Sequence, residues 1–255
     1  MAILKDFQAD ALRVRVSDSR EAMGRDAARA AGERIRALLR ERDEINMIFA
    51  AAPSQNETLK YLAREEGIDW HRVNAFHMDE YVGLSREAPQ SFGYYLCEHV
   101  FSLLPFKSVN FLRGDAPDAA AECARYAELL RRFPPDVVML GIGENGHIAF
   151  NEPGQVLHNN AHIEALTEST IAANARFFAD ADAVPKKAIS MGMGDIMRAS
   201  KIILIATGPK KADAIRGLIM NENVDVNNPS TMLKMHPDVT VIIDRPLADL
   251  VGYTD

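Results

Sequence analysis

The sequence predicts an α/β fold in which helices cover both faces of a mainly parallel sheet. Short apolar runs alternate along the chain with longer amphipathic segments, and strands that alternate with helices of about ten or more residues are typical of parallel sheets. The apolar runs also lack the polar alternation of half-exposed strands, which fits strands that are buried on both sides. No linker, low-complexity tract or internal repeat interrupts the 255 residues, so we expect residues 1–255 to form a single domain.

The expected elements follow one another in a regular order. The first is a helix over residues 19–42, whose apolar positions recur at helical spacing. Short apolar runs then predict strands at residues 45–53, 108–114, 135–143, 201–208 and 238–244, and residues 72–83 predict a strand that runs into a loop. The amphipathic segments between these strands predict helices at residues 56–67, 91–104, 118–133 and 210–220.

The composition excludes several classes of function. The net charge is −7, whereas a nucleic-acid-binding surface needs clustered lysine and arginine; a few local cations can still bind a small anion. The N-terminus lacks a signal peptide, and no apolar run approaches about 18 residues, so we expect a soluble, cytoplasmic protein with no membrane partner. Cys97 and Cys123 are expected to be reduced thiols. The histidines are scattered and no HExxH or paired CxxC motif occurs, so no metal site is expected.

Polar and glycine-rich segments follow four of the expected strands. In open parallel sheets, ligands bind at the carboxyl ends of the strands, where loops lead into helices. We therefore expect a functional site where these segments meet. The segments are AAPSQNE (51–57), HMDEYVG (77–83), GIGENGHIAFNEPG (141–154) and TGPKK (207–211).

The segment 141–154 combines glycines with acid–base side chains. Glycines such as Gly143 let the backbone turn tightly and approach a ligand closely. His147 can carry protons near neutral pH, and Glu152 is close enough in the chain to fold back against its imidazole. The GxGxxG spacing does not indicate a dinucleotide site, because it follows a later strand instead of the first. A glycine-rich turn with a structural histidine explains the composition equally well.

Two further segments offer a carboxylate and cations. Asp79 and Glu80 are adjacent and follow an apolar run, and because successive residues of an extended chain point in opposite directions, only one should face a ligand. Lys211 opens a helix, where a lysine and the helix N-terminus form an anion site. Arg176, between aromatic residues, is a further candidate cation. The alternative to a catalytic carboxylate is a solvated acidic turn, and the alternative to an anion site is a solvated pair of lysines. Together the segments predict acid–base chemistry on an anionic small molecule, without a cofactor.

Four motifs then resemble the glucosamine-6-phosphate deaminases, which share a superfamily with the 6-phosphogluconolactonases. They are FHMDEYVGL (76–84), LGIGENGHIAFNEPG (140–154), AANARFF (172–178) and NPSTMLKMHPDVTVIID (228–244). The resemblance covers about residues 45–245, in the same order. It implies a single α/β domain with a Rossmann-like, mainly parallel sheet. It also implies a reaction that opens the ring of a hexosamine 6-phosphate, moves a proton between C2 and C1, and releases ammonia to leave a ketose phosphate.

The resemblance also assigns roles to individual residues. Asp79 would be the base for the C2 proton, and His147 would be the acid and base at the ring oxygen, with Glu152 orienting it. Lys211 and Arg176 would hold the phosphate of a small-molecule sugar phosphate. An aldose–ketose shift needs one carboxylate base and one group that protonates oxygen, and it needs no metal.

The chain departs from the family pattern in three places. Asn145 stands where many members have Asp, which removes a charge beside His147. The phosphate loop of the family usually reads Thr-Gly-Gly-Thr-Pro, whereas here it contains Ala52 and Pro53, and proline removes a backbone donor. Ser54, Gln55 and Asn56 are expected to supply hydrogen bonds there instead. The positions of the allosteric site in enterobacterial-type relatives read Gln155, His162 and Glu164, so we expect no activation by N-acetylglucosamine 6-phosphate.

Several alternatives remain open from the sequence. A deaminase acting on another sugar, such as galactosamine 6-phosphate, has the same motifs. A 6-phosphogluconolactonase-type hydrolase is disfavoured by the MDEY and FNEP motifs. A non-catalytic sugar-phosphate sensor has no need to keep Asp79, His147 and Glu152 together. The relatives include both monomers and hexamers, so a homo-oligomer is compatible with the sequence.

Overall fold

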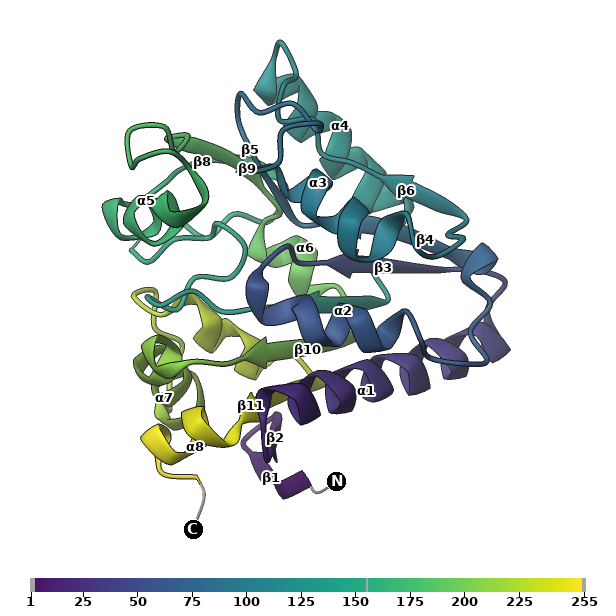
Figure 1. The fold of residues 1–255 in the computed structure, drawn as a ribbon, viewed down its shortest axis with the longest axis vertical. Helices are drawn as coiled ribbons and strands as arrows, with labels where there is room; N and C mark the ends of the chain where they lie inside the picture. The colour runs from purple at the N-terminus through teal and green to yellow at the C-terminus, as the bar shows by residue number, and fades with distance from the viewer. Residues whose placement is uncertain (1–2, 155, 254–255) are drawn as a thin grey trace.

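Eight strands form the central sheet of the protein. The computed structural model describes residues 3–154 and 156–253. The strand order is β1-β2-β11-β10-β7-β3-β4-β6 (Figure 1). Every neighbouring pair is parallel except the β1–β2 hairpin. The predicted α/β fold with a mainly parallel sheet is therefore confirmed.

The central strands are β1 (Ile3–Ala9), β2 (Leu12–Ser17), β3 (Ile45–Phe49), β4 (Val73–His77), β6 (Ser108–Asn110), β7 (Val137–Leu140), β10 (Lys201–Ala206) and β11 (Val239–Asp244). A second, antiparallel sheet of order β5-β9-β8 contains β5 (Asp79–Tyr81), β9 (Lys187–Ser190) and β8 (His162–Ala165). The helices are α1 (Arg20–Glu41), α2 (Asn56–Leu62), α3 (Phe92–Leu96), α4 (Ala119–Arg132), α5 (Glu168–Asn174), α6 (Met193–Met197), α7 (Ala212–Met220) and α8 (Arg245–Val251). Short 3₁₀ turns are η1 (Pro53–Gln55), η2 (Trp70–Arg72), η4 (Ala175–Phe177), η5 (Pro209–Lys211) and η6 (Pro229–Met235), and η3 (Cys97–Phe101) is a π turn.

Helices cover both faces of the central sheet, as the sequence predicts. Side chains of α1, α2 and α3 form one apolar core with one face of the sheet, and Figure 1 shows α1 and α2 lying along it. Side chains of α4, α6, α7 and α8 form a second core with the opposite face. Because both faces are buried, the central strands read as continuous apolar runs.

The structure contains two groups of strands that the sequence did not predict. The N-terminal hairpin β1–β2 and the three-stranded sheet were not expected from the sequence. In β2, Leu12, Val14 and Val16 are fully buried while arginines alternate with them. This alternation arises because β2 pairs with β11 close to the margin of the sheet. The predicted helix 91–104 is α3 followed directly by the π turn η3.

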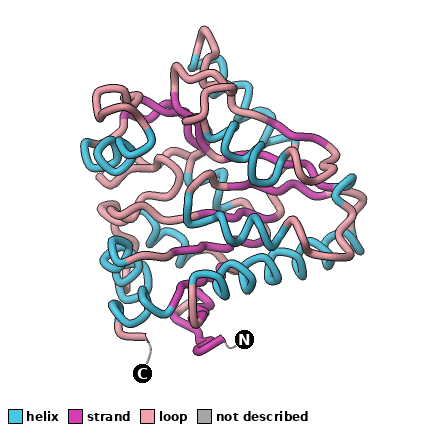
Figure 2. Tube along the Cα trace, viewed as in Figure 1, coloured by secondary structure: helices cyan, strands magenta, loops and turns pink. Residues whose placement is uncertain are grey.

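The order of the strands creates a crevice at one end of the sheet. From β3 the chain continues to its neighbour β4, whereas from β7, on the other side of β3, it continues towards β10. The connections after β3 and β7 therefore diverge, and parallel sheets bind ligands at such a point. Figure 2 shows loops gathered at the left of the view, at this end of the sheet. No helix in the described ranges has the length and apolarity needed to cross a membrane.

Candidate active site

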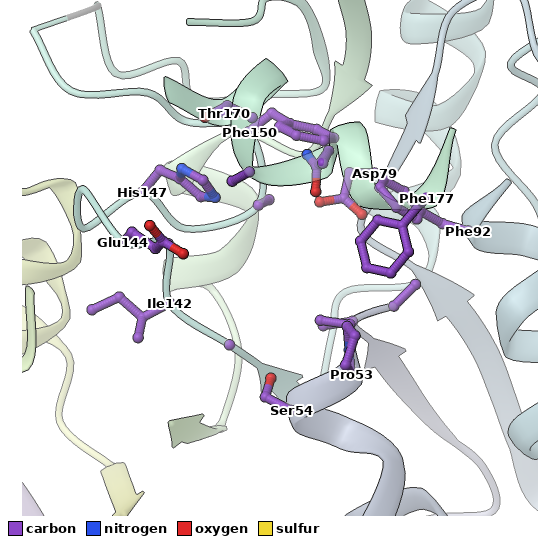
Figure 3. A pocket seen from close by; sticks show the side chains of 18 of the residues that line it. Pro53, Ser54, Asp79, Phe92, Ile142, Glu144, His147, Phe150, Thr170 and Phe177 are labelled. Atoms are coloured by element: carbon purple, nitrogen blue, oxygen red, sulfur yellow. The ribbon is translucent and has the colours of Figure 1, made fainter. Parts of the chain in front are cut away.

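A cavity of about 730 Å³ lies at the carboxyl ends of β3, β4, β7 and β10. Residues from all four polar segments singled out in the sequence line it. Figure 3 shows that the carboxylate of Asp79 and the imidazole of His147 lie on opposite sides of the open space, with Ser54 at a third side. The lining residues used below are Arg20, Ser54, Asp79, Gly143, Glu144, Asn145, His147, Arg176, Lys210 and Lys211.

Asp79 and Glu80 point in opposite directions from strand β5. Asp79 lines the cavity. Glu80 instead accepts hydrogen bonds from the backbone N–H groups of Tyr81, Phe92 and Gly93, so it ties β5 to the start of α3. The expectation that only one of the two carboxylates would face a ligand agrees with this arrangement.

The carboxyl group of Asp79 is buried, with 9% of the residue exposed. Burial, together with the charge of Glu80, raises the pKa of Asp79 to about 8. His77 holds the same segment from behind, because its Nδ1–H donates to the carbonyl oxygen of Asp79 at 3.0 Å while its Nε2 accepts the N–H of Leu112 at 2.8 Å. Burial lowers the pKa of His77 to about 4. His77 is thus a core histidine that positions the backbone of Asp79.

Glu152 stands directly behind His147. Its Oε2 lies 3.5 Å from Nδ1 of His147, and the carboxyl group is fully buried and does not reach the cavity. Burial raises the pKa of Glu152, but His147, the hydroxyl of Thr170 (2.5 Å) and the amide of Asn145 more than offset this, and the pKa falls to about 2. An ionised carboxylate at this place orients the imidazole so that Nε2 is left for a ligand.

Asn145 links the two ends of this loop. Its Nδ2 donates to Oε2 of Glu152 at 3.0 Å, and its Oδ1 accepts the backbone N–H of His147 at 3.3 Å. The amide therefore bonds to the backbone of His147 instead of to its imidazole. Because it donates to Glu152, Asn145 favours the charged form of that carboxylate.

Two glycines are needed for this loop to close. A Cβ at Gly143 would lie 2.4 Å from Nδ1 of His147, and a Cβ at Gly146, where φ is 86°, would lie 2.0 Å from Oδ1 of Asn228. The N–H of Gly143 donates to the carbonyl oxygen of His147 at 2.9 Å. Gly143 was predicted to bind substrate; it lines the cavity, but its N–H is used within the loop, so its contribution is to make room for the imidazole.

Basic side chains of η4 and η5 line the cavity. Lys211 ends η5, and burial lowers its pKa although Glu144 opposes this. Arg176 belongs to η4 and lies over the ring of Phe177 at 4.7 Å. The more exposed Lys210 lies 3.6 Å from Glu144. Lys211 and Arg176 are close enough to repel each other electrostatically. Two positive charges near one another attract a small anion.

The loop after β3 departs from what the sequence predicted. Ser54 lines the cavity. Gln55 does not: its side chain turns inward, with 1% of the residue exposed. Asn56 does not either, because the hydroxyl of Tyr95 donates to its Oδ1. Of the three residues predicted to bind substrate, only Ser54 belongs to the cavity lining.

Arg20 is a lining residue that the sequence analysis missed. It is the first residue of α1; its Nη2 donates to the carbonyl oxygen of Pro53 at 2.5 Å, and its Nε lies 2.9 Å from Glu57. The only sequence signal for Arg20 was its position directly after the N-cap Ser19. Its contact with Pro53 could not be predicted, because the two residues are 33 positions apart. Aromatic rings, among them Phe92, also line the cavity and were not predicted.

Two of the residues at the allosteric positions of relatives lie on β8, away from the cavity lining. His162 and Glu164 are both buried or nearly so, and Nε2 of His162 lies 3.1 Å from Oε2 of Glu164. Gln155 lies outside the described residues.

The comparisons with known proteins agree with the motifs. The family model of glucosamine-6-phosphate isomerases/6-phosphogluconolactonase matches residues 18–242. A glucosamine-6-phosphate deaminase of Listeria monocytogenes serotype 4a (strain HCC23) is 47% identical over 208 residues, which are 82% of this chain and 88% of the relative. A glucosamine-6-phosphate deaminase of Exiguobacterium sp. (strain ATCC BAA-1283 / AT1b) is 47% identical over 186 residues, 72% of each chain.

Solved structures of proteins from the same family also resemble this chain. A monomeric glucosamine-6-phosphate deaminase superposes with a TM-score of 0.86 at 35% identity, over 93% of this chain and 99% of the other. The 6-phosphogluconolactonase from Trypanosoma brucei superposes with a TM-score of 0.78 at 17% identity, over 92% and 97%, and so shares the fold. The chain belongs to the family of glucosamine-6-phosphate isomerases and 6-phosphogluconolactonases.

Proposed function

We propose that this protein is a glucosamine-6-phosphate deaminase, which converts glucosamine 6-phosphate to fructose 6-phosphate and ammonia in amino-sugar catabolism. One observation carries the proposal: a buried carboxylate, Asp79, faces a histidine–carboxylate pair, His147 and Glu152, across a cavity that also contains basic side chains. The deaminases that match at 47% identity support the same reaction.

The first step assigned to this site is ring opening. His147 donates a proton to the ring oxygen as the C1–O bond breaks, and it takes up the proton that the C1 hydroxyl loses as the aldehyde forms, so it serves as both acid and base. Glu152, held ionised behind it, orients the imidazole. Asn145 keeps the carboxylate in place. The product of this step is the open-chain 2-amino aldehyde.

Asp79 carries the second step. Its carboxylate removes the proton from C2 while the aldehyde oxygen takes up a proton from the ammonium group, which gives an enolamine. Asp79 then returns its proton to C1, which leaves the imine of the ketose. Water then adds to the imine carbon, and ammonia leaves. A pKa near the working pH is what such a base needs, because it must both accept and release the proton. Lys211 and Arg176 hold the phosphate, which positions C2 near Asp79.

The loop after β3 is compatible with a second candidate substrate. Pro53 begins η1, and Ala52 precedes it, so this loop lacks the glycines and one backbone donor of the usual phosphate loop. A different hexosamine phosphate, such as galactosamine 6-phosphate, is compatible with the same proton transfers. A cytoplasmic location accompanies the proposal, because Cys97 and Cys123 are both free in the described chain.

Ammonia release from a panel of sugars tests the proposal. The panel contains glucosamine 6-phosphate, galactosamine 6-phosphate, both amines without phosphate, and 6-phosphogluconolactone as a hydrolysis control. Ammonia from glucosamine 6-phosphate, with fructose 6-phosphate in equal amount, is the expected result. Turnover of galactosamine 6-phosphate alone would move the assignment to that epimer. Hydrolysis of the lactone, or tight binding without turnover, would replace it with a lactonase or a sensor.

A further inference from the structure

Two histidines and a glutamate gather outside the cavity lining. His162 and Glu164 lie two residues apart on β8, so both side chains leave the same face of that strand. His158 comes from the loop before β8, and its ring stacks on that of His162 at 4.0 Å. One nitrogen from each histidine and a carboxylate oxygen of Glu164 all lie within 4.8 Å of one another. The spacing His158-x₃-His162 is a sequence signal for metal binding that the expectation of no metal site passed over.

The hydrogen bonds of His162 leave an acceptor facing an acceptor. Nδ1 lies 3.2 Å from the carbonyl oxygen of Asn160, which can only accept, so Nδ1 carries the proton. Nε2 then presents a lone pair to Oε2 of Glu164 at 3.1 Å. A cation, either a proton or a metal ion, must lie between these two atoms. A proton would need only this pair, whereas the third donor, His158, completes a set of metal ligands.

The loop that carries His158 is held in place by two glycines. A Cβ at Gly192 would lie 2.4 Å from the carbonyl oxygen of His158 and 2.6 Å from that of Asn160. A Cβ at Gly194 would lie 2.7 Å from the carbonyl oxygen of Asn159. This close approach fixes both the backbone of His158 and the carbonyl group that orients His162. An orienting carbonyl on the far nitrogen of a ligand histidine is the usual support of a metal site.

The spacing and the chemistry of the donors select the metal. Two ligands bound at about 2.0–2.1 Å to a tetrahedral zinc ion lie about 3.3 Å apart, close to the 3.1 Å between Nε2 of His162 and Oε2 of Glu164. Two imidazoles with one carboxylate suit zinc and its neighbours in the first transition row, whereas magnesium and calcium prefer oxygen alone. His158 is exposed, so a water can take the fourth position on the ion. We propose that His158, His162 and Glu164 bind a divalent transition-metal ion of the zinc type.

The proposed metal site adjoins the catalytic side chains without sharing them. In the three-stranded sheet Asp79 pairs with Ser190, and Ser190 pairs with His162, so His162 lies two strands, about 10 Å, from Asp79. The site stands whether or not the proposed deaminase activity is correct, because none of its ligands lines the cavity.

Equilibrium dialysis against Zn²⁺ tests the proposal on the full chain, stripped first with a chelator. Metal content is then measured by atomic emission, with Mg²⁺ as the comparison ion. We expect one Zn²⁺ per chain and no Mg²⁺. His158→Gln and Glu164→Gln should each weaken zinc binding about tenfold or more, since each removes one ligand. The matched control is His71→Gln, which alters another exposed histidine outside the cluster and should leave the affinity unchanged.

Two results would overturn the site. A native chain that takes up no zinc in dialysis means that the cation between His162 and Glu164 is a proton. Zinc binding that persists at full affinity in His158→Gln or in Glu164→Gln means that the ion binds elsewhere. Because His158 is exposed, its substitution leaves the core intact, and circular dichroism confirms that each variant is folded before its affinity is compared.

Discussion

At the residue scale, the burial of Asp79 determines how pH acts on the reaction. The pKa of Asp79 is about 8, so at neutral pH most of the empty sites hold a protonated carboxyl group that cannot act as a base. We expect kcat/KM for glucosamine 6-phosphate to rise with pH until it levels off above about pH 8. Initial rates between pH 6 and 9.5 measure this. A profile that is flat over that range would remove Asp79 from the role of base.

Asp79→Asn separates catalysis from stability. We expect it to abolish turnover while sugar-phosphate binding remains. The folded pKa of about 8 lies above the ordinary aspartate value of 3.8, so the native state holds a proton that the unfolded state loses. The stability from this group is fully present below about pH 3.8 and is lost as the pH rises through about 8.

The neutral amide of the Asp79→Asn variant does not undergo this loss. The variant should therefore exceed the native chain in free energy of unfolding by roughly 1–3 kcal/mol at pH 8, the range for a buried unpaired polar group, and by much less at pH 5. Urea denaturation at both pH values measures the difference. Full activity in this variant would show that the base is another residue.

Lys211 and Lys210 form a matched pair for testing the anion site. Lys211 is desolvated, whereas Lys210 is exposed and lies beside Glu144. A hydrogen bond to a charged group contributes about 1.5–3 kcal/mol, so Lys211→Ala should raise KM about 10- to 100-fold and change kcat less. Lys210→Ala should change KM by only a few-fold. Equal effects of the two substitutions would place the phosphate at the mouth of the cavity instead.

Sequence reasoning located side chains whose direction the backbone alone determines. Asp79 and Glu80 had to diverge because they are neighbours on a strand, and Glu152 could reach His147 within one glycine-rich loop. Gln55 and Asn56 lie outside the lining, which the sequence did not indicate, because the direction of such a side chain depends on partners distant in the sequence. For Asn56 that partner is Tyr95, 39 residues away. Arg20 was missed for the same reason.

At the element scale, α5 and η4 form a weakly anchored wall of the cavity. Thr170 is the one buried residue of α5, and no residue of η4 is buried, although Arg176 of η4 lines the cavity. Segments with so few buried contacts open locally at small cost in free energy. A phosphate bound to Arg176 would add a contact that exists only while α5 and η4 stay folded against the cavity.

We therefore expect glucosamine 6-phosphate to slow amide hydrogen exchange in residues 168–177. Mass spectrometry of peptides with and without the ligand measures this, and α4, which packs in the core through Tyr126 and Leu130, serves as the internal control. Equal protection of α4 would indicate global stabilisation, and no change in residues 168–177 would separate Arg176 from the phosphate.

The elements that sequence reasoning missed share a physical cause. The strands β5, β8 and β9 have three or four residues each, too few for a periodic pattern to appear. They exist because three distant segments pair with one another, and that pairing cannot be inferred from any one of them. The central strands were predictable because burial on both faces makes each an unbroken apolar run.

At the scale of the whole molecule, the N-terminal hairpin closes one margin of the sheet. In β2, Leu12, Val14 and Val16 are fully buried, and each such side chain contributes about 1.5–3 kcal/mol. Deleting residues 1–18 should therefore cost about 5–9 kcal/mol, most of the stability of an ordinary domain. Deleting residues 1–9 removes only side chains that are exposed or half-buried in the described part of β1.

Urea denaturation of the two truncated chains tests this. We expect the shorter deletion to keep a cooperative transition and the longer one to lose it. Equal stability of both chains would mean that β2 is dispensable. Size-exclusion chromatography of the same samples also determines whether the native chain forms a homo-oligomer, which stays a prediction.

The separation of Asp79 from the loop after β3 has a consequence for how this protein can evolve. Asp79, the proposed base, belongs to the small antiparallel sheet, whereas Pro53 and Ser54 belong to a loop of the central one. Mutations in that loop can therefore retune which sugar is accepted while the proton-transfer apparatus is inherited unchanged. A lineage under selection for a new nutrient would accumulate its adaptive substitutions between residues 51 and 56 before it altered anything near Asp79.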